Sequence, residues 1–148
     1  MILLDALLSE SVRVGAVRGG TSIVFTAVGE TIAERSGVLN LGAEGCMLAG
    51  ALAAYAVGIE TGSPWLGAVA GVLAGAVLAA VHAFVVLRRG ANQVATGLAV
   101  TFLGVGATAL FGQSYVSQGV VPFEIWEIPV LSELPFLGPL LFAHDPLT

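Results

Sequence analysis

The sequence contains no lysine and little charge of either sign. All five of its cations are arginines, and charged residues make up only 10% of the 148 positions, against roughly 25% in an ordinary soluble domain. Without lysine, the chain supplies neither the lysine of a phosphate-binding P-loop nor a Schiff-base lysine. The net charge of −5 argues against a nucleic-acid partner. If ATP is used, another subunit must bind it.

Residues for metal binding and catalysis are also scarce. Cys46 is the only cysteine, which excludes an internal disulfide and any cysteine-rich metal site. His82 and His144 are far apart and have no acidic partners at metal-ligand spacing, so we expect a bundle histidine, an interfacial histidine and no metal. The chain has no G-x-S-x-G elbow and no carboxylate pair at catalytic spacing. We therefore expect neither a cofactor nor an enzymatic activity.

Apolar residues dominate what remains. Hydrophobic residues make up 57% of the chain and the mean hydropathy is +0.96, too apolar to cover a water-facing surface. A membrane-spanning helix needs about 20 mostly apolar residues. Four stretches qualify, and the first is the weakest because it holds Arg13, Arg18 and Glu30. Residues 1–148 are thus predicted to form an all-α, polytopic membrane helix bundle with spans at 12–33, 41–59, 64–87 and 94–112.

The remaining segments are predicted to lie at the membrane surfaces. Residues 113–145 contain prolines, Trp126 and several acids, which is typical of an interfacial loop and not of a span. Leu134–Phe142 is apolar but too short to cross. Positively charged loops stay cytoplasmic, so Arg88 and Arg89 are placed inside, and the N-terminus and the 113–145 loop outside. Arg13 and Arg18 then contradict this rule, so either the first segment does not fully span or a neighbouring segment sets its direction.

Small residues recur every four positions on two of the predicted helices. Small residues let membrane helices approach closely and make van der Waals contact. We favour bundle packing over a ligand role for both ridges. The first ridge consists of Gly67, Gly71, Gly75, Ala79 and Ala83, and the second of Gly50, Ala54 and Gly58.

Charge is concentrated between residues 29 and 45. An ionisable group at the bilayer centre costs at least about 2.5 kcal/mol on insertion scales, so such a cluster needs an explanation. Gly37 suits the left-handed residue after a helix, and Asn40 the N-cap of the next helix, with Glu44 in its first turn. The pattern predicts a broken helix near residues 34–44. Two interpretations remain open: a transporter site or gate at membrane depth, or a short cytoplasmic loop with solvated charges.

The residues of this break resemble a known signature. Residues 34–45, ERSGVLNLGAEG, are similar to the signature of membrane permease subunits of ABC importers in the ribose and branched-chain amino acid permease superfamily. Residues 92–98, NQVATGL, and the stretch 128–142 agree with the branch associated with nucleoside and simple-sugar uptake. The resemblance runs from about Val14 onward. Cys46 departs from it, standing where the family more often has a plain apolar residue.

The resemblance implies a mechanism and partners. Such permeases resemble two related halves, of which this chain looks like the first, in the inner (plasma) membrane. The implied partners are ATP-binding cassette ATPase subunits, an extracytoplasmic substrate-binding protein and a second permease subunit, working by alternating access. The alternatives are a branched-chain amino acid permease of the same superfamily and a small, non-transporting membrane helix-bundle protein. The residues implied for the substrate path or gate are Glu30, Asn40, Glu44, Gln93 and Thr96.

Overall fold

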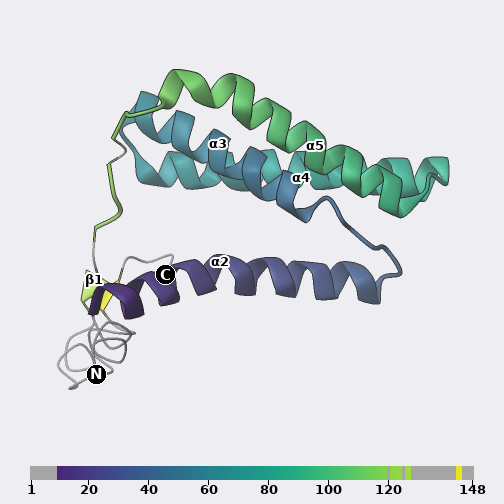
Figure 1. Cartoon of the computed structure of the whole chain (residues 1–148), viewed down its shortest axis with the longest axis horizontal. Helices are drawn as coiled ribbons and strands as arrows, with labels where there is room; N and C mark the ends of the chain where they lie inside the picture. The colour runs from purple at the N-terminus through teal and green to yellow at the C-terminus, as the bar shows by residue number, and fades with distance from the viewer. Residues whose placement is uncertain (1–9, 120, 125, 128–142, 145–148) are drawn as a thin grey trace. The chain divides into compact units, whose positions relative to one another are not determined.

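The protein is built of helices, as the sequence predicts. The computed structural model describes residues 10–119, 121–124, 126–127 and 143–144. Four long helices follow one another along the chain, and a 3-10 helix, η1, continues from the last (Figure 1). Their bounds are α2 Glu10–Arg35, α3 Ala43–Thr61, α4 Pro64–Arg89, α5 Gln93–Phe111 and η1 Gly112–Tyr115. The all-α fold class and the interruption between residues 35 and 43 are confirmed.

The described residues form two units. The larger runs from Gly29 to Pro122 and contains α3, α4, α5 and η1. The other includes the start of α2 and a short antiparallel strand pair, β1 (Trp126–Glu127) with β2 (Ala143–His144). Within the predicted interfacial loop 113–145, the described residues form most of η1 and the strands β1 and β2; its place at the membrane surface stays a prediction. Leu134–Phe142 lies outside the described residues.

Three helices of the larger unit are long and apolar enough to cross a membrane: α3, α4 and α5, the last with η1 included. The described helix α2, which carries charges along its length, is not among them. Large apolar side chains are exposed on these helices, with Val72 and Phe102 each 71% exposed. Because water would not favour such a surface, the three-helix unit is suited to lipid or to further protein around it.

Glycine and capping residues set the helix ends. Gly37, Gly62 and Gly90 have φ of 86°, 66° and 65° just beyond the ends of α2, α3 and α4, in the left-handed region where glycine carries no Cβ penalty. The predicted role of Gly37 is therefore confirmed. At the start of α5, the Asn92 side chain accepts a hydrogen bond from the Ala95 amide at 3.0 Å, which satisfies a backbone donor that the helix leaves free.

Asn40 is not the N-cap of α3, contrary to the prediction. That position belongs to Gly42, which makes no side-chain capping bond. The Asn40 Oδ1 instead accepts a hydrogen bond from the Gly42 amide, 3.0 Å away. An asparagine bonded to the backbone two residues on stabilises a local turn in competition with a helix, so α3 begins later than predicted. Glu44 does lie in the first turn of α3.

Helices α3 and α4 pack antiparallel through small residues. A Cβ added to Gly50 would lie 3.1 Å from the Gly71 oxygen, and one added to Gly67 would lie 2.6 Å from the Ala54 oxygen. Gly58 also lies against Gly67, and Ala79 is partly buried farther along α4. Backbone therefore contacts backbone directly, which a side chain larger than hydrogen at Gly67 or Gly71 would prevent.

Helices α3 and α5 run parallel. The Thr101 hydroxyl donates to the Leu41 oxygen at 3.0 Å, and the Thr108 hydroxyl donates to the Leu48 oxygen at 3.4 Å; each pair is 60 residues apart in the sequence. A Cβ added to Gly104 would lie 2.5 Å from the Cα of Gly45. The two helices thus share a close seam whose register is set by hydrogen bonds.

Candidate functional site

The Gln93 side chain joins the break between α2 and α3 to the start of α5. The Leu39 amide donates to Gln93 Oε1 at 2.6 Å, and Gln93 Nε2 donates to the Gly37 oxygen at 3.3 Å. An amide side chain offers both an acceptor and donors, so Gln93 satisfies one donor and one acceptor of the non-helical backbone. We call these two bonds the Gln93 fork.

Close backbone contacts continue along α5 from the Gln93 fork. A Cβ added to Gly97 would lie 2.9 Å from the Leu41 nitrogen, and one added to Gly42 would lie 2.9 Å from Val100 Cβ. Because Gly97 and Gly42 have no side chains, the end of the break lies directly on α5. The break is therefore a packed element.

Of the five residues predicted for a path or gate, only Gln93 bonds across elements. Asn40 makes the local turn described above, and the Thr96 hydroxyl donates to the Asn92 oxygen of its own helix end at 2.9 Å. Glu30 lies on α2, five residues before the helix ends at Arg35. Among the described residues it takes no part in the Gln93 fork. Asn40 is thus one residue away from Leu39 of the fork, and Glu30 makes none of the fork's hydrogen bonds. The assignment of these residues to a substrate path stays a prediction.

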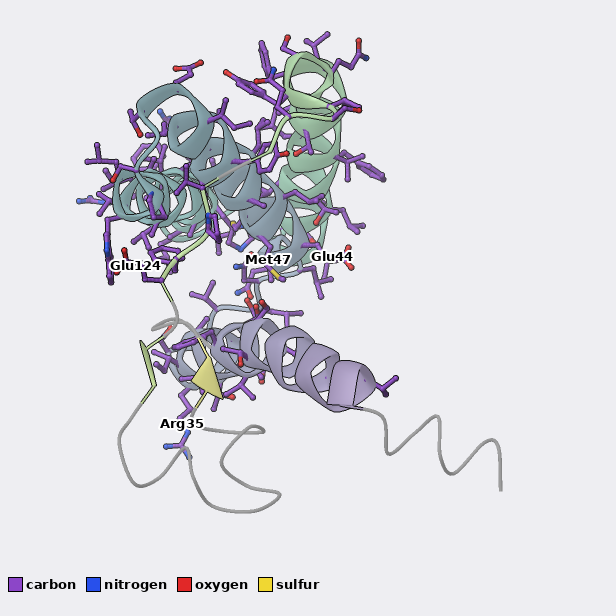
Figure 2. All side chains as sticks on the ribbon, turned by 90° about the vertical axis from the view of Figure 1, so that its left-hand side faces the viewer. Arg35, Glu44, Met47 and Glu124 are labelled. Carbon is purple, nitrogen blue, oxygen red and sulfur yellow. The ribbon has the colours of Figure 1, made fainter. Side chains whose placement is uncertain are left out.

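Glu44 borders an open hollow on one side of α3. The side chain is exposed, and with Met47, Leu48 and Ala51 it lines a space of about 390 Å³. Figure 2 shows Glu44 and Met47 on neighbouring turns of α3. A carboxylate at the first turn of a helix interacts favourably with the helix dipole, and the Glu44 side chain is accessible at this position.

A second hollow lies near the other end of α3, where α5 passes into η1. Its volume is about 340 Å³, and its polar lining comes from Tyr55, Thr108, Tyr115 and Ser117. We call this space the tyrosine hollow. The Tyr115 hydroxyl donates to Glu60 Oε1 at 2.6 Å, and the Tyr55 hydroxyl donates to the Gln118 oxygen. Hydrogen bonds from both tyrosines therefore tie η1 and the residues after it to α3.

Sequence reasoning missed the tyrosine hollow. Residues 113–145 were predicted to form an interfacial loop, and Tyr55 was only one apolar position in a span. The available signal was weak: Tyr55 and Glu60 near one end of a predicted helix, and Tyr115 directly after another predicted to end on the same side of the membrane. Nothing in the sequence states that the two helices are neighbours.

His82 is buried on α4 with unusual surroundings. Its side chain is 2% exposed, and neither ring nitrogen has a hydrogen-bond partner among the described residues. The described part of the chain holds no group of three or more His, Cys, Asp or Glu side chains arranged to bind a metal ion. Val86, one turn further along α4, is 6% exposed. His82 thus lies among the few fully buried side chains of the bundle.

The chain is similar to known transport proteins over most of its length. Residues 14–129 match the family described as the permease component of branched-chain amino acid transport systems. A putative glucose ABC transporter permease protein of Haloferax volcanii, TsgC13, is 42% identical over 130 residues, which cover 85% of this chain and 40% of the relative. The guanosine ABC transporter permease protein NupQ of Bacillus subtilis is 33% identical over 132 residues, covering 82% of this chain and 41% of the relative.

A third relative is also named as an ABC transporter permease. The nucleoside ABC transporter permease protein NupC of Lactococcus lactis is 27% identical over 137 residues, covering 86% of this chain and 43% of the relative. The chain thus spans about two fifths of the length of these relatives. No solved structure matches it. The family match covers well over half of the sequence, including the break and the Gln93 fork, and the resemblance seen in residues 34–45 is confirmed. The chain belongs to the permease family of branched-chain amino acid transport systems.

Proposed function

We propose that this chain is part of a membrane permease subunit of an ABC importer that moves nucleosides or simple sugars across the inner membrane. The observation that carries the proposal is the similarity to permeases named for glucose and guanosine, which covers 85% and 82% of the chain. ATP hydrolysis is assigned to separate ATPase subunits, because this sequence has no lysine for a phosphate-binding loop. An extracytoplasmic binding protein and a second permease subunit complete the proposed complex.

The proposed orientation follows from the arginines. Arg88 and Arg89 end α4, and basic ends stay cytoplasmic. The start of α5 and the Gln93 fork then lie near the cytoplasmic face. Since α3 and α5 run parallel, the tyrosine hollow lies near the outer face.

Within this complex, the break works as a gate element. Asn40 and Gln93 have their polar groups bonded to backbone, so we assign them to holding the gate's shape. Glu44 is exposed beside the 390 Å³ hollow, which supports a direct contact with a polar substrate on its path. Glu30 and Thr96 are proposed for the same path. The small-residue ridges hold α3 and α4 in close contact.

Transport assays on the assembled complex test the proposal. Proteoliposomes containing the permease, its ATPases and its binding protein are expected to take up labelled guanosine or glucose in an ATP-dependent, saturable way. Glu44→Gln is expected to slow this uptake. The matched control is Glu124→Gln, the same change of charge at an exposed position outside the break and outside both hollows, and it is expected to leave uptake unchanged.

Two other outcomes separate the alternatives. Saturable leucine uptake without guanosine or glucose uptake would assign the chain to branched-chain amino acid transport, which the family's own description supports. If the assembled complex takes up none of the three compounds, the chain is better described as a non-transporting membrane helix bundle.

A further inference from the structure

The tyrosine hollow has the size and lining of a small-molecule site. Its volume of about 340 Å³ lies at the lower end of the range of about 300–1,000 Å³ for ligand pockets. Two aromatic rings, Tyr55 and Tyr115, and two hydroxyl side chains, Thr108 and Ser117, line it together with small and apolar residues. Such a mixture is typical of sites that bind an apolar ring face and a polar edge at once.

Hydrogen bonds hold the walls of the hollow in place. The Tyr115 hydroxyl donates to Glu60 on α3, and Tyr55 on α3 donates to the Gln118 oxygen beyond η1. Gln118 Nε2 in turn donates to the Ser114 oxygen at 2.7 Å. Each tyrosine oxygen keeps lone pairs that can accept a further hydrogen bond. The site is therefore preformed, which lowers the entropy lost when a ligand binds.

The backbone at Ser117 supports the same conclusion. Its φ is 67°, which makes it the only residue other than glycine with a positive φ among the described residues. A serine held in the left-handed region persists only where the surroundings fix it, and such residues cluster at ligand sites. Here the strained residue lines the hollow.

The lack of charged side chains in the lining indicates which class of ligand fits the hollow. None of the described residues that line the hollow is ionisable at neutral pH, and the nearby Glu60 already accepts the Tyr115 hydrogen bond. The carboxylate of a zwitterionic amino acid would find no cationic partner in the lining, and its desolvation would weaken binding. An uncharged ring compound would stack on a tyrosine and bond its hydroxyl or amide groups to the lining oxygens.

We propose that the tyrosine hollow is a binding site for uncharged, polar ring compounds, nucleosides or monosaccharides, at the outer end of the permease. This proposal rests on the proposed function, because it assigns the hollow to the same substrates before they reach the membrane-spanning path. Tyr55 and Tyr115 supply ring contacts, and Thr108 and Ser117 supply hydrogen bonds. The rival explanation is that the tyrosines only anchor the helix ends at the membrane interface.

Substrate protection of an introduced thiol tests the site directly. Replacing Cys46 with alanine removes the only cysteine of this chain, after which Ser117→Cys places a thiol in the hollow of the assembled complex. A membrane-impermeant maleimide added from outside is expected to label the S117C thiol, and guanosine or glucose to slow this labelling several-fold. Thr61→Cys is the control, because Thr61 is exposed near the same end of α3 and does not line the hollow. Its labelling should not change with either compound, and leucine should protect neither thiol.

Removing the aromatic ring of Tyr55 provides a second test of the site. Tyr55→Leu is expected to raise the half-protecting ligand concentration by about tenfold, the lower part of the range measured when an aromatic stacking partner is lost. Tyr55→Phe keeps the ring and removes only the hydroxyl bond to Gln118. It should therefore raise the half-protecting ligand concentration less than Tyr55→Leu does.

The outcomes separate this proposal from the proposed function. If guanosine or glucose is transported but does not protect the S117C thiol, or if Tyr55→Leu and Tyr55→Phe behave alike, the site is refuted and the transport function stands. The proposal also fails if the S117C thiol reacts only from the cytoplasmic side. If neither compound is transported and neither protects, both proposals fall together.

Discussion

An alanine at Gly104 is expected to destabilise the bundle, whereas an alanine at Gly106 is not. A Cβ at Gly104 would lie 2.5 Å from both the Cα and the oxygen of Gly45, and a Cβ at Gly106 would meet nothing within 4 Å. The two positions are on the same helix and two residues apart, so both substitutions remove a glycine from similar helical backbone. The comparison isolates the contact between α3 and α5.

The magnitude follows from the size of the overlap. Carbon atoms in contact prefer a separation of about 3.5–4.0 Å, so α5 would have to move about 1 Å away from α3. Overpacking of this kind costs about 1–3 kcal/mol. Replacing glycine by alanine within a helix returns about 1 kcal/mol at either position. Both variants gain the same helix propensity, so this gain cancels when they are compared. Gly104→Ala should then be less stable than Gly106→Ala by about 1–3 kcal/mol.

Thermal inactivation in detergent measures this difference. Membrane proteins of this kind are best compared by rates, because unfolding is commonly irreversible. The fraction of monodisperse protein left after heating, followed by size-exclusion chromatography, should fall about tenfold faster for Gly104→Ala than for Gly106→Ala. Equal half-lives would refute the close seam between α3 and α5.

Three further predictions concern the packing ridge, the fork and the buried histidine. Gly71→Leu should lower the detergent-extracted yield because its Cβ would lie 2.9 Å from the backbone of α3, whereas Cys46→Ala should be nearly silent; equal yields would contradict the packing. Gln93→Leu removes an acceptor 2.6 Å from the Leu39 amide, so hydrogen exchange at that amide should accelerate, and unchanged exchange would exclude the fork. His82→Leu removes a buried polar group without a partner in the described structure and should raise thermal stability by about 1–3 kcal/mol; a lower melting temperature would show that the imidazole is bonded.

Helix positions could be predicted from the sequence because they depend on local properties. Pro64 begins α4, and the apolar run after it ends at Arg88 and Arg89 as predicted, within two residues. Gly37 marks the end of α2 because only glycine adopts its backbone conformation without strain. Length, hydropathy and glycine or proline punctuation all act within one or two helical turns, so a single sequence contains them.

Contacts between residues on different helices could not be predicted in the same way. The polarity of Gln93 was visible, but its bond to Leu39 joins residues 54 apart. The contact of Gly45 with Gly104 joins two helices, whereas a repeat of small residues every four positions describes one face of a single helix and does not identify its partner. Asn40 was assigned to the wrong bond, since a helix cap and a local turn use the same side chain and differ only in backbone geometry.

The two threonine bonds from α5, one to Leu48 of α3 and one to Leu41 just before it, have a mechanical consequence. Thr101 and Thr108 are seven residues apart, and so are their acceptors on Leu41 and Leu48. A shift of one helix past the other by a single residue, about 1.5 Å, would break both bonds at once. The pair should therefore move as one rigid unit, so that a displacement at the end of α5 that carries Gln93 is transmitted to the end that continues into η1.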